Sequence, residues 1–154
     1  MAFRLRRDAR DQLFRHFLHP KKQIGLDFDI YYFCLMAGLS TSRKRDAGQL
    51  DIVDLVQGFP GPYREKGRLI VGVFLSSELN GLGIDRSDRK QVHDALRSLV
   101  SPASPSYLSD EGEREFNKYA HGGVDVLAEW FGEPPQTLET FLPTFRSKIA
   151  ENFK

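Results

Sequence analysis

The sequence of 154 residues has almost none of the features that mark a secreted or membrane-spanning protein. It contains one cysteine, Cys34, so no internal disulfide can form. No apolar stretch approaches the roughly 20 residues that a membrane-spanning helix needs. The apolar residues near the N-terminus are few and interrupted by arginine, unlike a secretory signal. These absences predict a protein of the reducing cytoplasm without a membrane segment.

Signatures of catalysis and cofactor binding are also absent. The four histidines are scattered, and none has a second strong ligand at metal-binding spacing. The chain has neither a phosphate-binding loop nor a dinucleotide fingerprint. The glycine pair in HGGVD, residues 121–125, has no GxSxG partner, so we interpret it as a close backbone approach or a helix break. Cys34 lies in an apolar run and is interpreted as structural. We expect no catalytic residue, no metal and no cofactor.

The apolar periodicity predicts an all-α fold, a compact single domain of six or seven helices over residues 1–154. Its core would span about 8–131, with a helical extension at 132–154. Phe28 to Leu39 is apolar on every side and predicts a buried central helix, with Asp27 as its N-cap, although its β-branched and aromatic residues also permit a strand. The other helices are expected over 8–18, 49–57, 69–79 (favoured over a strand), 86–99, from 109 with a bend or break at Gly122-Gly123, and 138–153.

The net charge of +1 conceals an asymmetry along the chain. Residues 1–45 hold 10 Lys and Arg against 4 Asp and Glu, a charge of +6, whereas residues 78–154 hold 9 against 13, a charge of −4. Such a gradient is typical of an anionic partner or of self-association between unlike faces. An unevenly charged, solvated surface is the alternative interpretation.

The basic residues gather in loops and at helix edges, an arrangement that suits phosphate oxygens. The most prominent group follows the buried run, which would hold its charges in place. No recognition helix is evident, so we expect contacts with the nucleic-acid backbone and little sequence preference. The predicted nucleic-acid-binding residues are Arg43, Lys44, Arg45, Arg64, Lys66, Arg68, Lys21 and Lys22, and a further basic group is Arg86, Arg89 and Lys90.

Four segments, in their order and spacing, resemble the DndE family of bacterial DNA phosphorothioation proteins: IGLDFDIYYFCLMAGL, KGRLIVGVFLSSEL, GLGIDRSDRKQVHDAL and NKYAHGGVDVLAEWF. FCLMAGL is similar to a cysteine-containing stretch of that family, and Gly123, Val124 and Leu127 match part of its closing signature. Residues 101–113 and the tail from Gly132 depart from the family pattern.

The resemblance implies an all-α homo-oligomer that binds duplex or nicked DNA through surface lysine and arginine. It also implies partnership with the sulfur-inserting enzymes of the system, which carry the chemistry. Carried over to this chain, the residues expected to touch phosphate are first Arg43, Lys44 and Arg45, then Arg64, Lys66 and Arg68.

Three functions are therefore considered. The first is a non-catalytic DNA-binding subunit of a bacterial DNA-modification, anti-phage system. The second is a protein–protein adaptor or assembly subunit without DNA contact, in which the basic N-terminal part pairs with the acidic region 110–133 of another copy or a partner. The third is a small enzyme with a cleft around His121 and an acid such as Asp125.

Overall fold

The computed structural model describes residues 2–18 and 27–153, and this part of the chain is predominantly helical. The predicted all-α fold class is confirmed, with one small two-stranded sheet added. None of the helices described combines the length and the apolar character needed to cross a membrane. The chain forms two compact units: unit 1 contains Met1–Arg4 and Asp54–Asn117, and unit 2 contains Leu5–Val53 and Lys118–Lys154.

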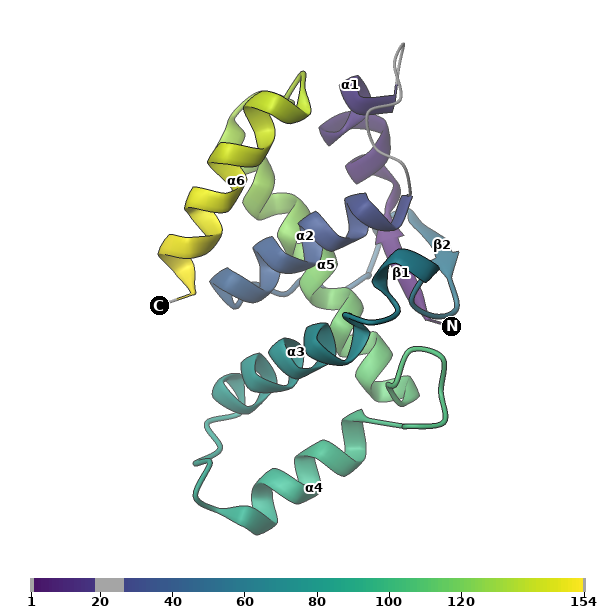
Figure 1. The fold of residues 1–154 in the computed structure, drawn as a ribbon, viewed down its shortest axis with the longest axis vertical. Helices are drawn as coiled ribbons and strands as arrows, with labels where there is room; N and C mark the ends of the chain where they lie inside the picture. Colours follow the sequence, from purple (N-terminus) through teal and green to yellow (C-terminus); the bar gives the residue numbers. More distant parts are fainter. Residues whose placement is uncertain (1, 19–26, 154) are drawn as a thin grey trace. The chain divides into compact units, whose positions relative to one another are not determined.

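Unit 1 is built on a pair of helices, α3 (Gly67–Gly81) and α4 (Arg89–Leu99), in which α4 returns alongside α3 (Figure 1). A single 3-10 turn, η2 (Gly61–Tyr63), precedes α3. The prediction of a helix rather than a strand over 69–79 is confirmed. Helix α4 begins three residues later than predicted because Asp88 caps it, its carboxylate accepting a hydrogen bond from the Gln91 N–H at 3.2 Å.

The core of unit 1 is a chain of phenylalanine rings. Phe3 packs on Phe59 and Phe116 with ring centroids 4.9 and 5.5 Å apart, and Phe74 meets Phe116 edge-on at 5.1 Å. Asn117, which is 4% exposed, accepts a hydrogen bond from the Arg4 N–H and donates one to the Ala2 carbonyl. These bonds tie the N-terminal residues to the helix that carries Phe116.

Unit 2 is built around α2 (Asp27–Thr41), and the predicted buried central helix is confirmed. One stripe of α2 is only half-buried, and it consists of Asp29, Tyr32, Phe33 and Met36. Helix α6 (Leu138–Asn152) packs against α2 (Figure 1). Rings from both helices meet, with Phe33 lying 4.9 Å from Phe141 and 5.1 Å from Phe145. The predicted helix over 8–18 is divided at Phe14 into one π-helical turn, η1 (Ala9–Leu13), and α1 (Arg15–Leu18).

Helix α5 (Asp110–Phe131) runs without a break through Gly122 and Gly123, so the predicted bend or break at this pair is wrong. In unit 2 the glycines instead allow α5 to lie directly on the backbone of α2. A Cβ atom on Gly123 would overlap the Cys34 carbonyl oxygen, and one on Gly38 would overlap the Tyr119 carbonyl oxygen. The close backbone approach that was the other interpretation of HGGVD is therefore present.

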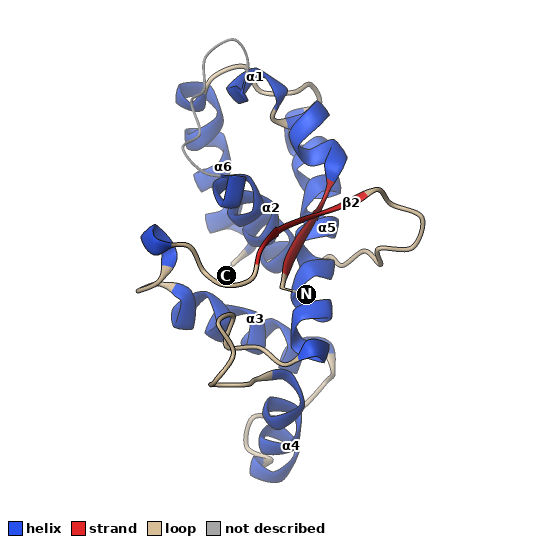
Figure 2. Ribbon diagram, turned by 90° about the vertical axis from the view of Figure 1, so that its right-hand side faces the viewer, coloured by secondary structure: helices blue, strands red, loops and turns tan. Residues whose placement is uncertain are grey.

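The predicted helix over 49–57 is wrong, because this segment contains strand β2 (Ile52–Val56), which pairs with β1 (Phe3–Arg6) (Figure 2). The β-branched residues Ile52, Val53 and Val56 favour the extended conformation. Beside the sheet, the Arg7 N–H donates to the Asp51 carbonyl at 2.8 Å. Backbone pairing with β1 outweighs the weak helical periodicity of this short segment.

Candidate nucleic-acid interface

Arg43 and Arg45, in the basic loop after α2, are engaged by acids of α5 within unit 2. The Arg43 guanidinium donates two hydrogen bonds to Glu129, at 2.6 and 2.7 Å. The Arg45 guanidinium contacts both carboxylate oxygens of Asp125, at 3.1 and 3.0 Å. The hydrogen bond from Arg43 lowers the pKa of Glu129, and the same contact raises the pKa of Arg43. Much of the charge of Arg43 and Arg45 is therefore balanced inside the protein.

Backbone contacts hold the same loop against α5. The Arg45 N–H donates to the Lys118 carbonyl at 3.0 Å, and the Lys44 ammonium lies 5.0 Å from the centre of the Tyr119 ring. A Cβ atom on Gly122 would come within 2.5 Å of the Arg43 carbonyl oxygen. The loop is consequently a strap fixed to the helix, which is a structural role that the sequence analysis did not assign to it.

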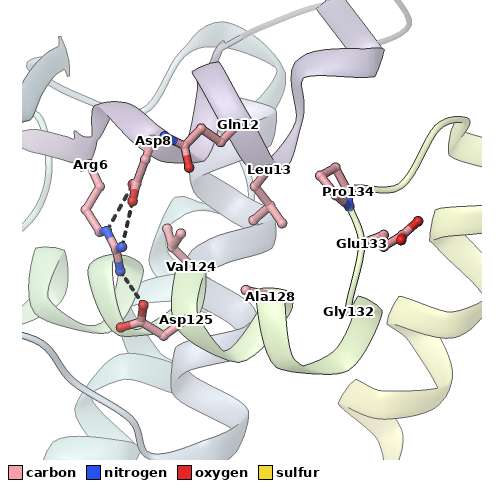
Figure 3. Close-up of a pocket in the computed structure, with 10 residues that line it drawn as sticks. All are labelled: Arg6, Asp8, Gln12, Leu13, Val124, Asp125, Ala128, Gly132, Glu133 and Pro134. Carbon is pink, nitrogen blue, oxygen red and sulfur yellow. Dashed lines mark hydrogen bonds and ion pairs between the residues drawn. The ribbon is translucent and has the colours of Figure 1, made fainter.

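Asp125 also anchors a buried arginine, Arg6, which lies at the end of β1 (Figure 3). The Arg6 guanidinium contacts Asp8 and Asp125, each at 2.7 Å, and donates to the His121 carbonyl at 3.1 Å. Burial alone would raise the pKa of Asp125, but the hydrogen bonds and charges of Arg6 and Arg45 outweigh burial and lower that pKa.

A cavity of about 170 Å³ opens beside this ion-pair network (Figure 3). The polar residues that line it include Arg6, Asp8, Asp125, Gln12 and Glu133. Arg6 already forms ion pairs with Asp8 and Asp125. The third functional hypothesis needs an exposed imidazole at His121, but this side chain is 2% exposed. Among the described residues, no three His, Cys, Asp or Glu side chains are grouped so that they could hold a metal ion.

The second predicted group of cations belongs to unit 1. Arg64 and Lys66 are exposed between η2 and α3, and neither makes an ion pair with any residue that the structure describes. Arg68, in the first turn of α3, lies over the Tyr107 ring at 5.5 Å. Lys21 and Lys22 lie outside the described residues.

Helix α4 carries a cationic face that was not among the predicted site residues. Arg89, His93 and Arg97 follow at intervals of four, and Lys90 lies three residues before His93, so all four occupy one side of the helix. All are exposed, and within the described chain none of the three basic residues, Arg89, Lys90 and Arg97, makes an ion pair. This four-residue periodicity is visible in the sequence and could have identified the face.

The position of Arg89 and Lys90 is unfavourable for the helix itself. Both lie in the first turn of α4, where the helix dipole favours negative charge and each cation costs about 0.3–1 kcal/mol. Arg86, just before the helix, donates to the Ser76 carbonyl and hydroxyl and to the Asn80 side chain, and so holds the turn that joins α3 to α4. Exposed cations that do not serve the helix are suited to binding an anion.

The structure thus separates the predicted cations by environment. Arg43 and Arg45 face acids in unit 2, whereas Arg64 and Lys66 are exposed in unit 1. Within unit 1, Arg64 and Lys66 precede α3 and the basic residues of α4 follow it, and α3 is about 22 Å long for its 15 residues. Arg89 and Lys90 therefore lie toward the opposite end of α3 from Arg64 and Lys66, whereas α4 returns alongside α3 toward Arg97. No protein-family model, curated protein or solved structure matches the chain.

Proposed function

We propose that this protein is a non-catalytic DNA-binding subunit that holds the phosphate backbone of duplex DNA with the cationic face of α4. The observation that carries the proposal is the set of exposed basic residues Arg89, Lys90 and Arg97, which have no described acidic partner. Their backbone positions are fixed on one helix before binding, and each side chain that becomes ordered on a phosphate costs roughly 0.5–1.5 kcal/mol. Contacts with the phosphate backbone carry no sequence information, so we expect the protein to show little preference for any DNA sequence.

The wider proposal is that the chain acts in a bacterial DNA-modification complex of the phosphorothioation type, as a homo-oligomer and in the cytoplasm. It is supported by the order of the DndE-like segments described above. Co-expression with the sulfur-inserting subunits of such a system tests it. Copurification supports the assignment, whereas separate elution of every subunit contradicts it.

Salt-dependent binding to a short duplex tests the DNA contact. The affinity of a phosphate-binding protein falls with salt, and each lost contact reduces the slope of log K against log salt by about 0.9. We expect the triple variant Arg89→Gln, Lys90→Gln, Arg97→Gln to bind more weakly and to reduce this slope by about 2.7. Its thermal stability should not fall, because two of the substitutions remove cations from the positive end of a helix.

Arg146→Gln is the matched control, because Arg146 is an exposed arginine of α6 without an ion pair in the described chain. The control should leave both affinity and slope unchanged. An unchanged slope in the triple variant, or an equal loss in the control, would contradict an interface on α4. A wild-type protein that does not bind duplex DNA at low salt would contradict the proposed function.

The adaptor function is the second candidate, and it is favoured by two exposed leucines. Leu69 of α3 is 70% exposed, and Leu82, directly after α3, is 61% exposed. An apolar contact with a protein partner would use these side chains. If the protein is an adaptor, Leu69→Gln reduces assembly with its partners while the triple variant of α4 assembles normally.

A further inference from the structure

Unit 1 contains an open apolar cavity of about 310 Å³ between α3 and the segment that joins α4 to α5. Val71 and Leu75 of α3 form one wall, and Val100 and Pro102 contribute the other. Among the residues that the structure describes, the only polar side chains that line it are Arg68 and Tyr107. Because no carboxylate lines the cavity, it is unsuited to a cationic ligand and suited to a flat apolar one.

Tyr107 is held in this cavity at a conformational cost. Its φ of 62° lies in the left-handed region, which is rare for a bulky side chain and costs of order 1–3 kcal/mol. The surrounding loop enforces this conformation, since the Tyr107 N–H donates to the Ser104 carbonyl and the Tyr107 carbonyl accepts from the Ser101 N–H. The antiparallel bridge of Val100 and Leu108 closes the loop. The ring is therefore placed in advance of any ligand.

Two groups position the ring further. The Phe59 ring is nearly parallel to Tyr107, with an angle of 27° and centroids 6.0 Å apart, and the Arg68 guanidinium lies 5.5 Å from the ring centre. Flat aromatic and guanidinium surfaces of this kind are the groups on which unpaired bases stack. Arg64 and Lys66, exposed four and two residues before Arg68, supply positive charge for the phosphates that flank such a base.

We infer that this cavity receives one unpaired nucleobase of the bound DNA. The inference rests on the proposed function, and adds that the protein distinguishes DNA with an unpaired nucleotide from continuous duplex. The base would lie between Val71, Leu75 and Val100, with one face against the flat groups of Arg68 and Tyr107. Stacking of this kind tolerates any base, so the preference is for an unpaired base and not for a sequence.

The test compares three duplexes of one sequence: a fully paired duplex, one with a single bulged adenosine, and one whose bulged nucleotide is abasic. The abasic duplex keeps the backbone of the bulge and removes only the base. We expect the wild-type protein to bind the bulged duplex about tenfold more tightly than the other two, in line with the usual contribution of one stacked base.

We expect Gly72→Leu to obstruct the cavity while the fold is retained. Gly72 lines the cavity, and a Cβ atom added to it meets no other atom within 4 Å. Gly81→Leu is the matched control, since Gly81 lies in the same helix, is equally open and does not line the cavity. We expect Gly72→Leu to abolish the preference for the bulged duplex while binding to the paired duplex is unchanged. Gly81→Leu should retain the preference.

Substitution of Tyr107 provides a second test. Asparagine tolerates a positive φ, so Tyr107→Asn removes the ring at little further strain, whereas Tyr107→Phe keeps it. The preference for the bulged duplex should disappear in Tyr107→Asn and persist in Tyr107→Phe.

Equal binding of all three duplexes by the wild-type protein would overturn the inference and leave the α4 interface standing. So would a preference that the abasic duplex shares, because the protein would then read the shape of the bulge. If the cavity serves a protein segment instead, Gly72→Leu leaves the affinity for every duplex unchanged, which also overturns the inference. Failure to bind any of the duplexes would overturn the inference together with the proposed function.

Discussion

The substitution Gly123→Ala tests the crossing of α2 and α5 on which unit 2 is built. The added Cβ atom would overlap the carbonyl oxygen of Cys34, and it would lie 3.0 Å from the backbone nitrogen of Gly38. Both are backbone atoms, so neither can move aside by rotation of a side chain. Overpacking typically costs 1–3 kcal/mol, and we place this case at about 3 kcal/mol because one of the two helices has to shift.

Alanine recovers about 1 kcal/mol over glycine through its higher helix propensity, so the net loss of unfolding free energy is about 2 kcal/mol. For a chain of this size, 1 kcal/mol changes the melting temperature by roughly 2–4 °C. Gly123→Ala should therefore lower the melting temperature by about 4–8 °C. Gly72→Ala, in open space on α3, should raise it by about 2–4 °C. Circular dichroism during a thermal ramp measures both, and a melting temperature of Gly123→Ala equal to or above the wild-type value would refute the crossing.

Three further predictions concern single side chains. Because the pKa of Asp125 is lowered below its unfolded value of about 3.9, its contribution to stability is complete above that pH and is lost as the pH falls through the lowered value. Denaturant unfolding should therefore show that Asp125→Asn is less stable than the wild type at neutral pH, and that the difference narrows below about pH 4; a constant difference would contradict the ion-pair network. Burial raises the pKa of the Cys34 thiol far above its ordinary value. Cys34 should therefore react with a disulfide reagent only as fast as the protein unfolds, and rapid labelling of the native protein would contradict its burial. Asp88→Ser keeps an N-cap on α4 and removes a negative charge beside Arg89 and Lys90, so duplex binding should tighten by about threefold at low salt with unchanged stability. An unchanged affinity, measured by fluorescence anisotropy, would argue against DNA contact at this end of α4.

The sequence predicts much of the fold because long apolar patterns leave few alternatives. Phe28 to Leu39 is longer than a usual strand and favours a largely buried helix, and α2 is that helix. The segment 49–57 is too short for its periodicity to distinguish a helix from a strand, and its pairing partner, β1, lies about 50 residues earlier. The glycine pair of α5 is ambiguous for a similar reason. Glycine permits both a helix break and a close contact, and only the position of α2 decides between them.

The candidate site was harder to predict because charge alone does not show which groups face each other. The basic loop at Arg43 stands out in the sequence, but its partner Glu129 lies 86 residues away. The basic residues of α4 are less conspicuous in the sequence, because Asp88 and Asp94 lie among them and reduce the local net charge. Their periodicity is nevertheless visible, whereas the placement of Tyr107 depends on a loop conformation that no local pattern specifies.

Asp125 accepts hydrogen bonds from two arginines that arrive from different parts of unit 2, Arg6 at the end of β1 and Arg45 in the strap. A carboxylate shared in this way makes its two donors energetically interdependent. When one arginine is removed, the other can interact more strongly with the carboxylate. The effects of the two single substitutions on stability should therefore not add up to the effect of the double substitution. Substitutions at the end of β1 and in the strap are therefore coupled in their effect on stability, although Arg6 and Arg45 are 39 residues apart in the sequence.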